Sequence, residues 1–401
     1  MAKFYREIKV IEESGLFDRL WYLAEYPDVK ETGMDPVRHY LWVGAALLRN
    51  PGPKFDTNAY LQANPGVRDA RINPLLHYLM GGAGNGITGA VQAARIDTRV
   101  REENAPPPEA PPAFCVAIPE EAIVGKAKQL AFPPLPEGRT PDVSILIPCL
   151  DEIRYTLECL FSIRNALRSG AVTYEVMMFD NGSTDATPDL LPRIPNLVYL
   201  REEENIGFGP ANNKAAGAAR GEHVMFLNND AQIAPGALEA LLAAIRSDEG
   251  IGVVGPKVLG FDGRLQEAGS RLNADGVPAF IGFGQDHRVP RFNYQREVEY
   301  VSGAALLMER ERFLALGGFD PIYAPAYYED TDLCFRLRAE GLKIHYVPEA
   351  VVVHHLSVTS GKGKQDRSRS ALLARNRQKF LQRWRGQLRA LEINSISAML
   401  L

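Results

Sequence analysis

The stretch MFLNNDAQ, residues 225–232, places three apolar residues directly before two amides and a carboxylate. A continuous apolar run of this kind is typical of a strand that is buried on both faces of a sheet. The polar residues Asn228, Asn229 and Asp230 would then follow the end of the strand, where open parallel sheets bind their ligands. A plain Asx turn explains the same triplet, so this stretch alone leaves both interpretations open.

Three further apolar runs precede this stretch, namely VSILIP, YEVMMF and LVYL, and a fourth, VVVHH, follows residue 350. Segments with helical periodicity separate the first strands, near residues 157–169, 185–191 and 210–219. Apolar strands that alternate with helices predict an α/β fold with a largely parallel sheet that is covered on both faces.

Polar clusters also end two of the earlier strands: PCLDE at residues 148–152 and DNGSTD at residues 180–185. Right-handed crossovers bring such loops to one edge of the sheet, so we expect Asp151, Asp180 and Asp230 to share a cleft. DNGSTD alone is equally explained as a turn followed by a helix cap. The glycine-rich patterns of dinucleotide-binding and P-loop proteins do not occur, which excludes both classes.

The composition describes a soluble globular chain of two or three folded units, with 401 residues, 46% of them hydrophobic and 23% charged. The net charge of -4 argues against nucleic acid as a partner. The four cysteines lack CxxC spacing, so we expect neither disulfides nor a zinc site and assign the chain to the cytoplasm. The charged first residues and the lack of a long uncharged apolar run lead us to expect neither a signal peptide nor a spanning segment.

The first part of the chain contains an internal repeat. FDRLWYLAEYPDV recurs as FDTNAYLQANPGV and DPVRHYLWVG as NPLLHYLMGG, each at an offset of 38 residues. Residues 1–88 are therefore predicted to form a small all-α domain of two such repeats. The repeated aromatic positions are either the shared core of two helical hairpins or a surface for a protein partner or an oligomer.

The remaining boundaries follow from composition. Residues 89–140 are proline-rich and are predicted to be a linker, and residues 141–361 hold the α/β pattern. Residues 362–401 form a basic tail with helical character near residues 371–384. The basic residues of this tail are explained by simple solvation, by binding of a lipid-linked acceptor, or by peripheral contact with the inner face of an anionic membrane.

From about residue 143 to residue 361 the chain resembles a family 2 glycosyltransferase of the GT-A fold, particularly the rhamnosyltransferase-like enzymes of bacterial surface polysaccharide synthesis. The resemblance rests on VSILIPCLDE, DNGSTDAT, ENIGFGPANN, FLNNDA and the segment from VSGAALLMER to VVVHH. It implies a Rossmann-like mixed sheet flanked by helices, as in nucleotide-diphospho-sugar transferases. It also implies an inverting cell-envelope enzyme that uses a UDP- or dTDP-sugar, a divalent cation and a glycan or lipid-linked oligosaccharide acceptor.

The resemblance also implies roles for single residues on the donor side. Asp180 would contact the nucleoside, and the residues that frame or approach the donor would be Pro148, Glu152, Asn205, Asn229 and Gly303. Gly303 is equally explained by packing in a strand.

The predicted metal ligands are Asp230 and His354. Relatives carry Asp-x-Asp where this chain has Asn228 as the first residue, so the cleft has one negative charge fewer and depends more on Asp230 and the donor diphosphate. An oxygen and imidazole set suits Mn²⁺ or Mg²⁺.

The predicted catalytic residues lie in AYYEDTDLCFRLRAEG, where the family's general base matches Asp330 and Glu329 would orient the acceptor. Acids in the first turn of a helix also simply favour its macrodipole. The helix N-terminus is expected to lower the pKa of Asp330. Processive relatives carry Gln-x-x-Arg-Trp, and here Phe380 replaces the glutamine, which predicts transfer of one sugar per encounter. The alternative function is a non-catalytic scaffold that binds polysaccharide or a partner.

Overall fold

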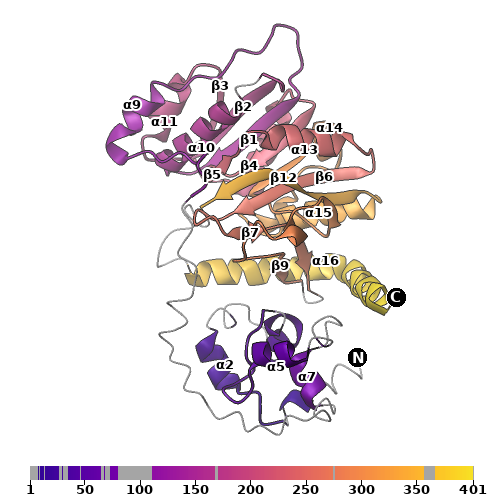
Figure 1. The fold of residues 1–401 in the computed structure, drawn as a ribbon. Helices are drawn as coiled ribbons and strands as arrows, with labels where there is room; N and C mark the ends of the chain where they lie inside the picture. The colour runs from indigo at the N-terminus through magenta and orange to yellow at the C-terminus, as the bar shows by residue number, and fades with distance from the viewer. Residues whose placement is uncertain are drawn as a thin grey trace. The chain divides into compact units, whose positions relative to one another are not determined.

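The computed structural model describes residues 8, 10–12, 14–26, 29, 35–45, 47–64, 67, 73–79, 111–167, 170–273, 276–355 and 366–400. Side chains are described within these ranges except at positions 42, 43, 366–368 and 389–400. The chain forms two compact units, Met1–Pro106 and Pro107–Leu401 (Figure 1).

The first unit is helical and shows the repeat in its contacts. Asp18 and Asp56, 38 residues apart, cap the first helix of each repeat. The Tyr22 hydroxyl lies 2.9 Å from His39 Nδ1, and the Tyr60 hydroxyl lies 2.7 Å from His77 Nδ1. Of the repeated aromatic residues, Tyr22, Tyr40 and Phe55 are buried in one shared core and Phe17 and Tyr60 pack against it, whereas Tyr78 is exposed. The described helices are α2 (Arg19–Glu25), α4 (Pro36–His39), the π-helical η1 (Tyr40–Gly44), α5 (Thr57–Ala63) and α7 (Pro74–Leu79).

The second unit is built on a mixed sheet in the order β10-β12-β6-β11-β4-β1-β2-β3, with β5 beside β12 and β7 beside β6. β1 pairs in parallel with β2 and β4, and β2 pairs in parallel with β3, as the apolar runs predict. β11 runs antiparallel between β4 and β6, which makes the sheet mixed. The strands are β1 (Val143–Cys149), β2 (Tyr174–Asn181), β3 (Leu197–Glu202), β4 (His223–Leu227), β5 (Ala231–Ile233), β6 (Ile251–Leu259), β7 (Leu265–Glu267), β10 (Arg296–Val298), β11 (Ala305–Glu309) and β12 (Lys343–His354).

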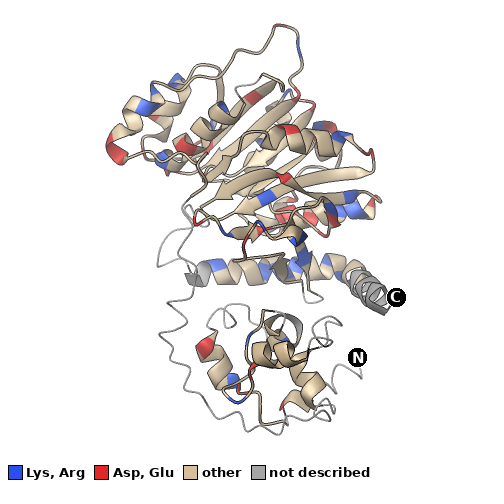
Figure 2. Cartoon of the chain, viewed as in Figure 1, with Lys and Arg blue, Asp and Glu red and all other residues tan. Residues whose placement is uncertain are grey.

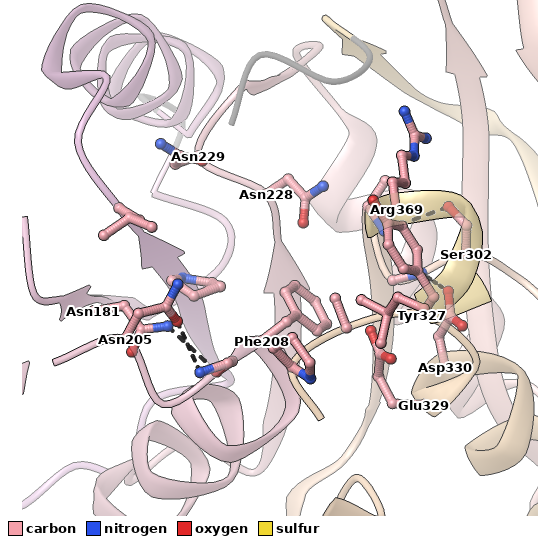
Figure 3. Close-up of a pocket in the computed structure, with 18 of the residues that line it drawn as sticks. Asn181, Asn205, Phe208, Asn228, Asn229, Ser302, Tyr327, Glu329, Asp330 and Arg369 are labelled. Carbon is pink, nitrogen blue, oxygen red and sulfur yellow. Dashed lines mark hydrogen bonds between the residues drawn. The ribbon is translucent and has the colours of Figure 1, made fainter. Parts of the chain in front are cut away.

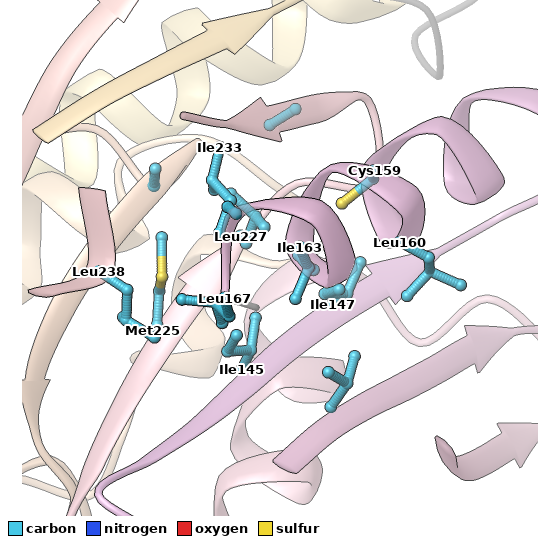
Figure 4. Close-up of a cluster of buried hydrophobic side chains, with 14 of the residues drawn as sticks. Ile145, Ile147, Cys159, Leu160, Ile163, Leu167, Met225, Leu227, Ile233 and Leu238 are labelled. Carbon is cyan, nitrogen blue, oxygen red and sulfur yellow. The ribbon is translucent and has the colours of Figure 1, made fainter. Parts of the chain in front are cut away.

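Helices cover both faces of this sheet, because alternate residues of each strand point to opposite sides. On one face Ile145 and Ile147 pack with Leu160 and Ile163 of α10 and Leu238 of α13 (Figure 4). On the other face lie α12, α14 and α15. The helices are α10 (Ile153–Ala166), α11 (Thr187–Leu190), α12 (Phe208–Ala218), α13 (Ala237–Arg246), α14 (Arg310–Ala315) and α15 (Glu329–Ala339). A hairpin of β8 (Ser270–Leu272) and β9 (Pro278–Phe280) lies apart from the sheet.

Part of the proline-rich segment folds against this unit. α9 (Ile123–Ala127) lies within it, and Ile118, Leu130 and Phe132 are buried in the core. The Ile118 N–H donates to Glu158 Oε1 of α10 at 2.8 Å. Residues 111–140 therefore pack as part of the second unit.

The basic tail forms the long helix α16 (Asp366–Leu400). Lys and Arg residues occur along its described part (Figure 2), but its apolar side packs on the domain. Phe380, Trp384 and Leu388 form a buried cluster with residues around Tyr323 and Phe335. No helix among the described residues has the length and apolar character needed to cross a membrane.

Candidate active site

A cavity of about 900 Å³ lies at the carboxyl ends of β1, β2 and β4. The polar residues that follow these strands converge there, as the topology predicts, together with later segments of the chain around residues 303, 327, 354 and 372. Figure 3 shows Asn181 and Asn205 on one side of the cavity and Glu329 and Asp330 on the other. The residues that line the cavity include Pro148, Asn181, Asn205, Gly207, Phe208, Asn228, Asn229, Asp230, Ser302, Gly303, Tyr327, Glu329, Asp330, His354, Arg369 and Arg375.

Asp230 and His354 lie together in this cavity, although 124 positions separate them in the sequence. β5 pairs antiparallel with the end of β12 and aligns Ala231 with His354, which brings the two side chains together. Asp230 Oδ1 lies 3.1 Å from His354 Nε2, and Asn228 Nδ2 lies 3.2 Å from the same nitrogen. Burial disfavours the charged form of Asp230, but the adjacent His354 outweighs it and lowers the pKa of this carboxyl.

The Asp230–His354 pair has one feature of an incomplete set of cation ligands. Asp230 is only 3% exposed, yet its Oδ1 has no hydrogen-bond partner of full geometry among the described residues, although His354 Nε2 lies 3.1 Å away. Buried carboxylate oxygens are normally paired, so this atom fits a site that takes a cation. Among the described residues no three His, Cys, Asp or Glu side chains come together as a metal site. The two side chains therefore fit a cation only if further ligands come from a bound molecule.

The two acids of α15 form another part of the lining. Asp330 Oδ2 accepts the Gly303 N–H at 2.7 Å, and Oδ1 accepts the Thr331 N–H at 2.7 Å. Burial raises the pKa of Asp330, so the expectation that the helix N-terminus lowers it is wrong. Desolvation of the charged carboxylate outweighs the two amide bonds that favour it.

Glu329 is buried beside Asp330, and its Oε2 has no hydrogen-bond partner among the described residues. Burial, followed by the charge of Asp330, raises the pKa of Glu329 well above its ordinary value. Burial therefore favours the protonated form of both neighbouring carboxyls, and the shift is large for Glu329. Neighbouring carboxyls with separated pKa values are typical of acid and base roles.

The structure leaves three residues that the sequence placed at the cleft outside the lining, namely Asp151, Glu152 and Asp180. Asp151 instead accepts the Thr184 and Asp185 N–H groups with Oδ1, at 2.7 and 3.2 Å. Asp180 is fully buried and accepts hydrogen bonds from Tyr199, Arg201 and the Ser183 N–H. Burial opposes ionisation of Asp180, but these bonds outweigh it and lower its pKa. Glu152 is exposed. The roles given to Asp180 and Glu152 stay predictions.

Asn181, which the sequence argument did not single out, lines the cavity instead of Asp180. Neighbouring residues on a strand point to opposite faces, so only one of the two can face the site. Asn181 Oδ1 accepts the Ile206 N–H at 2.9 Å, and Asn205 Oδ1 accepts the Gly207 N–H at 2.8 Å. These two bonds shape the loop before α12. Every residue of β2 is buried, so no pattern along this strand distinguishes Asn181 from Asp180 in the sequence.

Residues of α16 also reach the lining. The Arg369 guanidinium lies over the Tyr327 ring, 5.6 Å from its centroid. Arg375 donates to the Ala324 carbonyl and lines the cavity as well. No local pattern in the tail indicates this position, because it results from tertiary packing of the helix.

The comparisons with known proteins show the family of this chain. The Glycosyl transferase family 2 model matches residues 144–311. An N-acetylglucosaminyl-diphospho-decaprenol L-rhamnosyltransferase of Mycobacterium tuberculosis is 33% identical over 213 residues, which are 47% of this chain and 68% of that protein. The chain belongs to glycosyltransferase family 2, a family of sugar-transferring enzymes, and the mixed sheet confirms the predicted GT-A fold.

Two other relatives are much longer than the aligned region. Uncharacterized protein y4gI of Sinorhizobium fredii is 30% identical over 59% of this chain, but the alignment covers 28% of that protein. O-antigen biosynthesis protein RfbC of Myxococcus xanthus is 30% identical over 56% of this chain and is covered over 18% of its length.

Solved structures show weaker similarity. A mannosyltransferase from Pyrobaculum calidifontis in complex with GDP-Man and Mn²⁺ has a TM-score of 0.38 and 17% identity, covering 66% of this chain and 82% of that one. GalNAc-T7 with UDP, GalNAc and Mn²⁺ has a TM-score of 0.45 and 18% identity, covering 55% of this chain and 44% of that one.

Proposed function

We propose that this chain transfers one sugar at a time, with inversion, from a nucleoside-diphosphate sugar to a hydroxyl of a glycan or lipid-linked acceptor. The observation that carries the proposal is the single cavity that contains both the Asp230–His354 pair and the Glu329–Asp330 pair. Inverting transfer needs a leaving-group site and a base in one enclosure, on opposite sides of the reacting carbon.

Asp230 and His354 would hold the divalent cation, Mn²⁺ or Mg²⁺, with the unpaired Asp230 Oδ1 as its first oxygen ligand. A cation bound there neutralises charge on the donor diphosphate as the bond to the sugar breaks. Asn228 is neutral, so the protein supplies one carboxylate here. Donor and cation should therefore bind cooperatively, each weakly without the other.

Asp330 would accept the proton of the acceptor hydroxyl. Its raised pKa suits this role, because a base becomes stronger as its pKa approaches the working pH. The Gly303 amide fixes one carboxylate oxygen and thereby sets the direction of the other. Glu329, whose pKa is raised by burial, would in its protonated form donate a hydrogen bond to a sugar hydroxyl and so orient the acceptor or the donor.

The donor's nucleotide would occupy the part of the cavity lined by Pro148, Asn181 and Asn205. The names of the relatives guide the choice of substrates. One is a rhamnosyltransferase of a diphospho-decaprenol acceptor, and another is an O-antigen biosynthesis protein. We therefore place this chain in bacterial polysaccharide biosynthesis, with a deoxyhexose or hexose donor.

A panel of UDP-glucose, UDP-N-acetylglucosamine, GDP-mannose and dTDP-rhamnose, each with and without Mn²⁺, tests the proposal by thermal shift. A cognate donor should raise the melting temperature only with the cation present, since a ligand of the native state stabilises it by mass action. Asp230→Asn should abolish that dependence. Stabilisation by glycans but by no nucleotide sugar would favour the scaffold function, which the neutral Asn228 makes the second candidate.

A further inference from the structure

The C-terminal helix α16 contributes to the cavity although it lies beyond residues 144–311, the part matched by the family model. Four of its residues line the cavity: Arg369, Ala371, Leu372 and Arg375. We propose that α16 is part of the active site and that its Asn376 is a positioning residue, which fixes the loop that carries Glu329 and Asp330. This inference rests on the proposed function.

Asn376 is fully buried, and its amide nitrogen lies within hydrogen-bond distance of three backbone carbonyls, which share its two N–H groups. Its Nδ2 lies 2.6 Å from the Tyr323 oxygen and 2.9 Å from the oxygens of Ala326 and Tyr327. Its Oδ1 accepts a hydrogen bond from Arg375 Nε at 3.0 Å. Both ends of the amide are therefore used, and the donor end is directed only at residues 323–327.

The loop that Asn376 holds is in a conformation that side-chain-bearing residues rarely adopt. Tyr327 and Tyr328 both have φ of +76°. Bulky residues keep such angles only where the surrounding structure enforces them. Glu329 and Asp330 follow directly, so the direction of these two side chains depends on the loop. Asn376, a buried amide that contacts three carbonyls of this loop, can enforce these backbone angles directly.

α16 also contacts α15, the helix that begins with Glu329 and Asp330 and continues beyond them. Trp384 Nε1 donates to Asp332 Oδ1 at 2.7 Å, and Asp332 is fully buried on α15. The Phe380 ring lies between those of Tyr328 and Phe335, with centroid distances of 5.5 and 5.0 Å. The segment with Glu329 and Asp330 is thus fixed before and after by one helix.

The test replaces the donor end of the amide without changing its size. Asn376→Asp turns the donor into an acceptor facing three carbonyls. Gln378→Glu makes the same chemical change at an exposed position of the same helix and is the matched control. The assay is release of nucleoside diphosphate from UDP-glucose or dTDP-rhamnose with Mn²⁺, whichever the wild type turns over, together with amide hydrogen exchange of residues 324–331.

We expect kcat of Asn376→Asp to fall on the order of 100-fold, because a displacement of about 1 Å at a reacting group costs that much. The donor KM should change by less than about threefold, since the predicted metal ligands lie on other elements. The acid limb of the pH profile should move to lower pH as Asp330 becomes more exposed, which a general loss of folded protein would not cause. Amide exchange at residues 324–331 should accelerate, while Gln378→Glu should match the wild type.

Asn376→Ser retains a small donor and should lie between wild type and Asn376→Asp in kcat and in exchange, which keeps the test usable if the aspartate variant fails to fold. Equal kcat and equal exchange in Asn376→Ser and Gln378→Glu would overturn the inference. If the wild type releases nucleoside diphosphate from no donor, the proposed function fails, and the exchange measurement alone still decides whether Asn376 fixes the loop.

Discussion

Asp332 is the residue whose removal should most disturb the packing of α16 against α15. It is fully buried, and four side chains donate to its carboxylate. Arg336 Nε and Trp384 Nε1 lie 2.8 and 2.7 Å from its oxygens, and the Tyr323 hydroxyl and Arg383 Nη1 lie 3.1 and 3.3 Å away. Asp332→Ala leaves these donors without their acceptor.

The expected loss in the free energy of unfolding follows from the donors that Asp332→Ala leaves without an acceptor. Breaking a buried ion pair by removing one partner costs about 3–5 kcal/mol. In Asp332→Ala, Arg336 still donates hydrogen bonds to the carbonyls of Leu316 and Gly318. Loss of its ion pair with Asp332 should therefore cost a free energy near the lower limit of that range. A buried indole N–H without an acceptor adds about 1 kcal/mol or more. We expect Asp332→Ala to lower the free energy of unfolding by about 4 kcal/mol, and Asp332→Asn, which keeps one acceptor, by about half of that.

Urea unfolding followed by tryptophan fluorescence measures this loss. The chain has three tryptophans, and replacing Trp21 and Trp42 by Phe leaves Trp384 as the reporter of the α16 contact. Glu340→Ala, at an exposed acid that ends α15, is the control and should change stability by no more than about 0.5 kcal/mol. A loss below about 1 kcal/mol in Asp332→Ala would refute the view that this carboxylate joins the two helices.

Two further predictions concern buried carboxyls. Asp230→Asn should weaken Mn²⁺ binding at least tenfold in calorimetry and should lower unfolding stability at neutral pH, because the lowered pKa of Asp230 means that its charged form stabilises the native state; equal Mn²⁺ affinity would exclude this ligand. Burial raises the pKa of Glu267 from 4.5 to about 7, so its stabilising neutral form is fully present below pH 4.5 and is lost as the pH rises through 7. Glu267→Gln should therefore raise stability at pH 8.5 by on the order of 3 kcal/mol, with little change at pH 4.5, in urea titrations; the same gain at both values would show that ionisation is not the cause.

The sequence was sufficient for the strands that are continuous apolar runs. β1, β2, β3 and β4 were predicted in their parallel arrangement, because such runs with helices between them have few other solutions. β6 and β11 were not recognised. β6 contains Gly255 and Pro256, and β11 follows Gly303, so neither run has an uninterrupted strand pattern. The antiparallel insertion of β11 was therefore implied only by the family resemblance.

The site residues also fall into two groups, those that the sequence pattern alone predicted and those that required the family resemblance. Asn228, Asn229 and Asp230 were predicted from their position after β4, since topology alone brings strand ends together. His354 and Asp330 required the resemblance, because their proximity depends on distant packing. The sign of the Asp330 pKa change was wrong, since a sequence reveals the helix N-terminus but not the burial that outweighs it. The contribution of α16 could not be predicted, because basic residues on a helix do not show which side packs on the domain.

Turnover of Asp330→Asn tests the central claim most directly. The variant is nearly isosteric and retains an oxygen for the Gly303 amide, so donor and Mn²⁺ should bind as in the wild type. Loss of a general base should lower nucleoside diphosphate release in the presence of acceptor by about 100- to 10,000-fold. Glu329→Gln, which mimics the neutral acid, should stay within about tenfold of the wild type. Undiminished turnover by Asp330→Asn, or loss of donor binding instead of turnover, would contradict the assignment of Asp330 as the base.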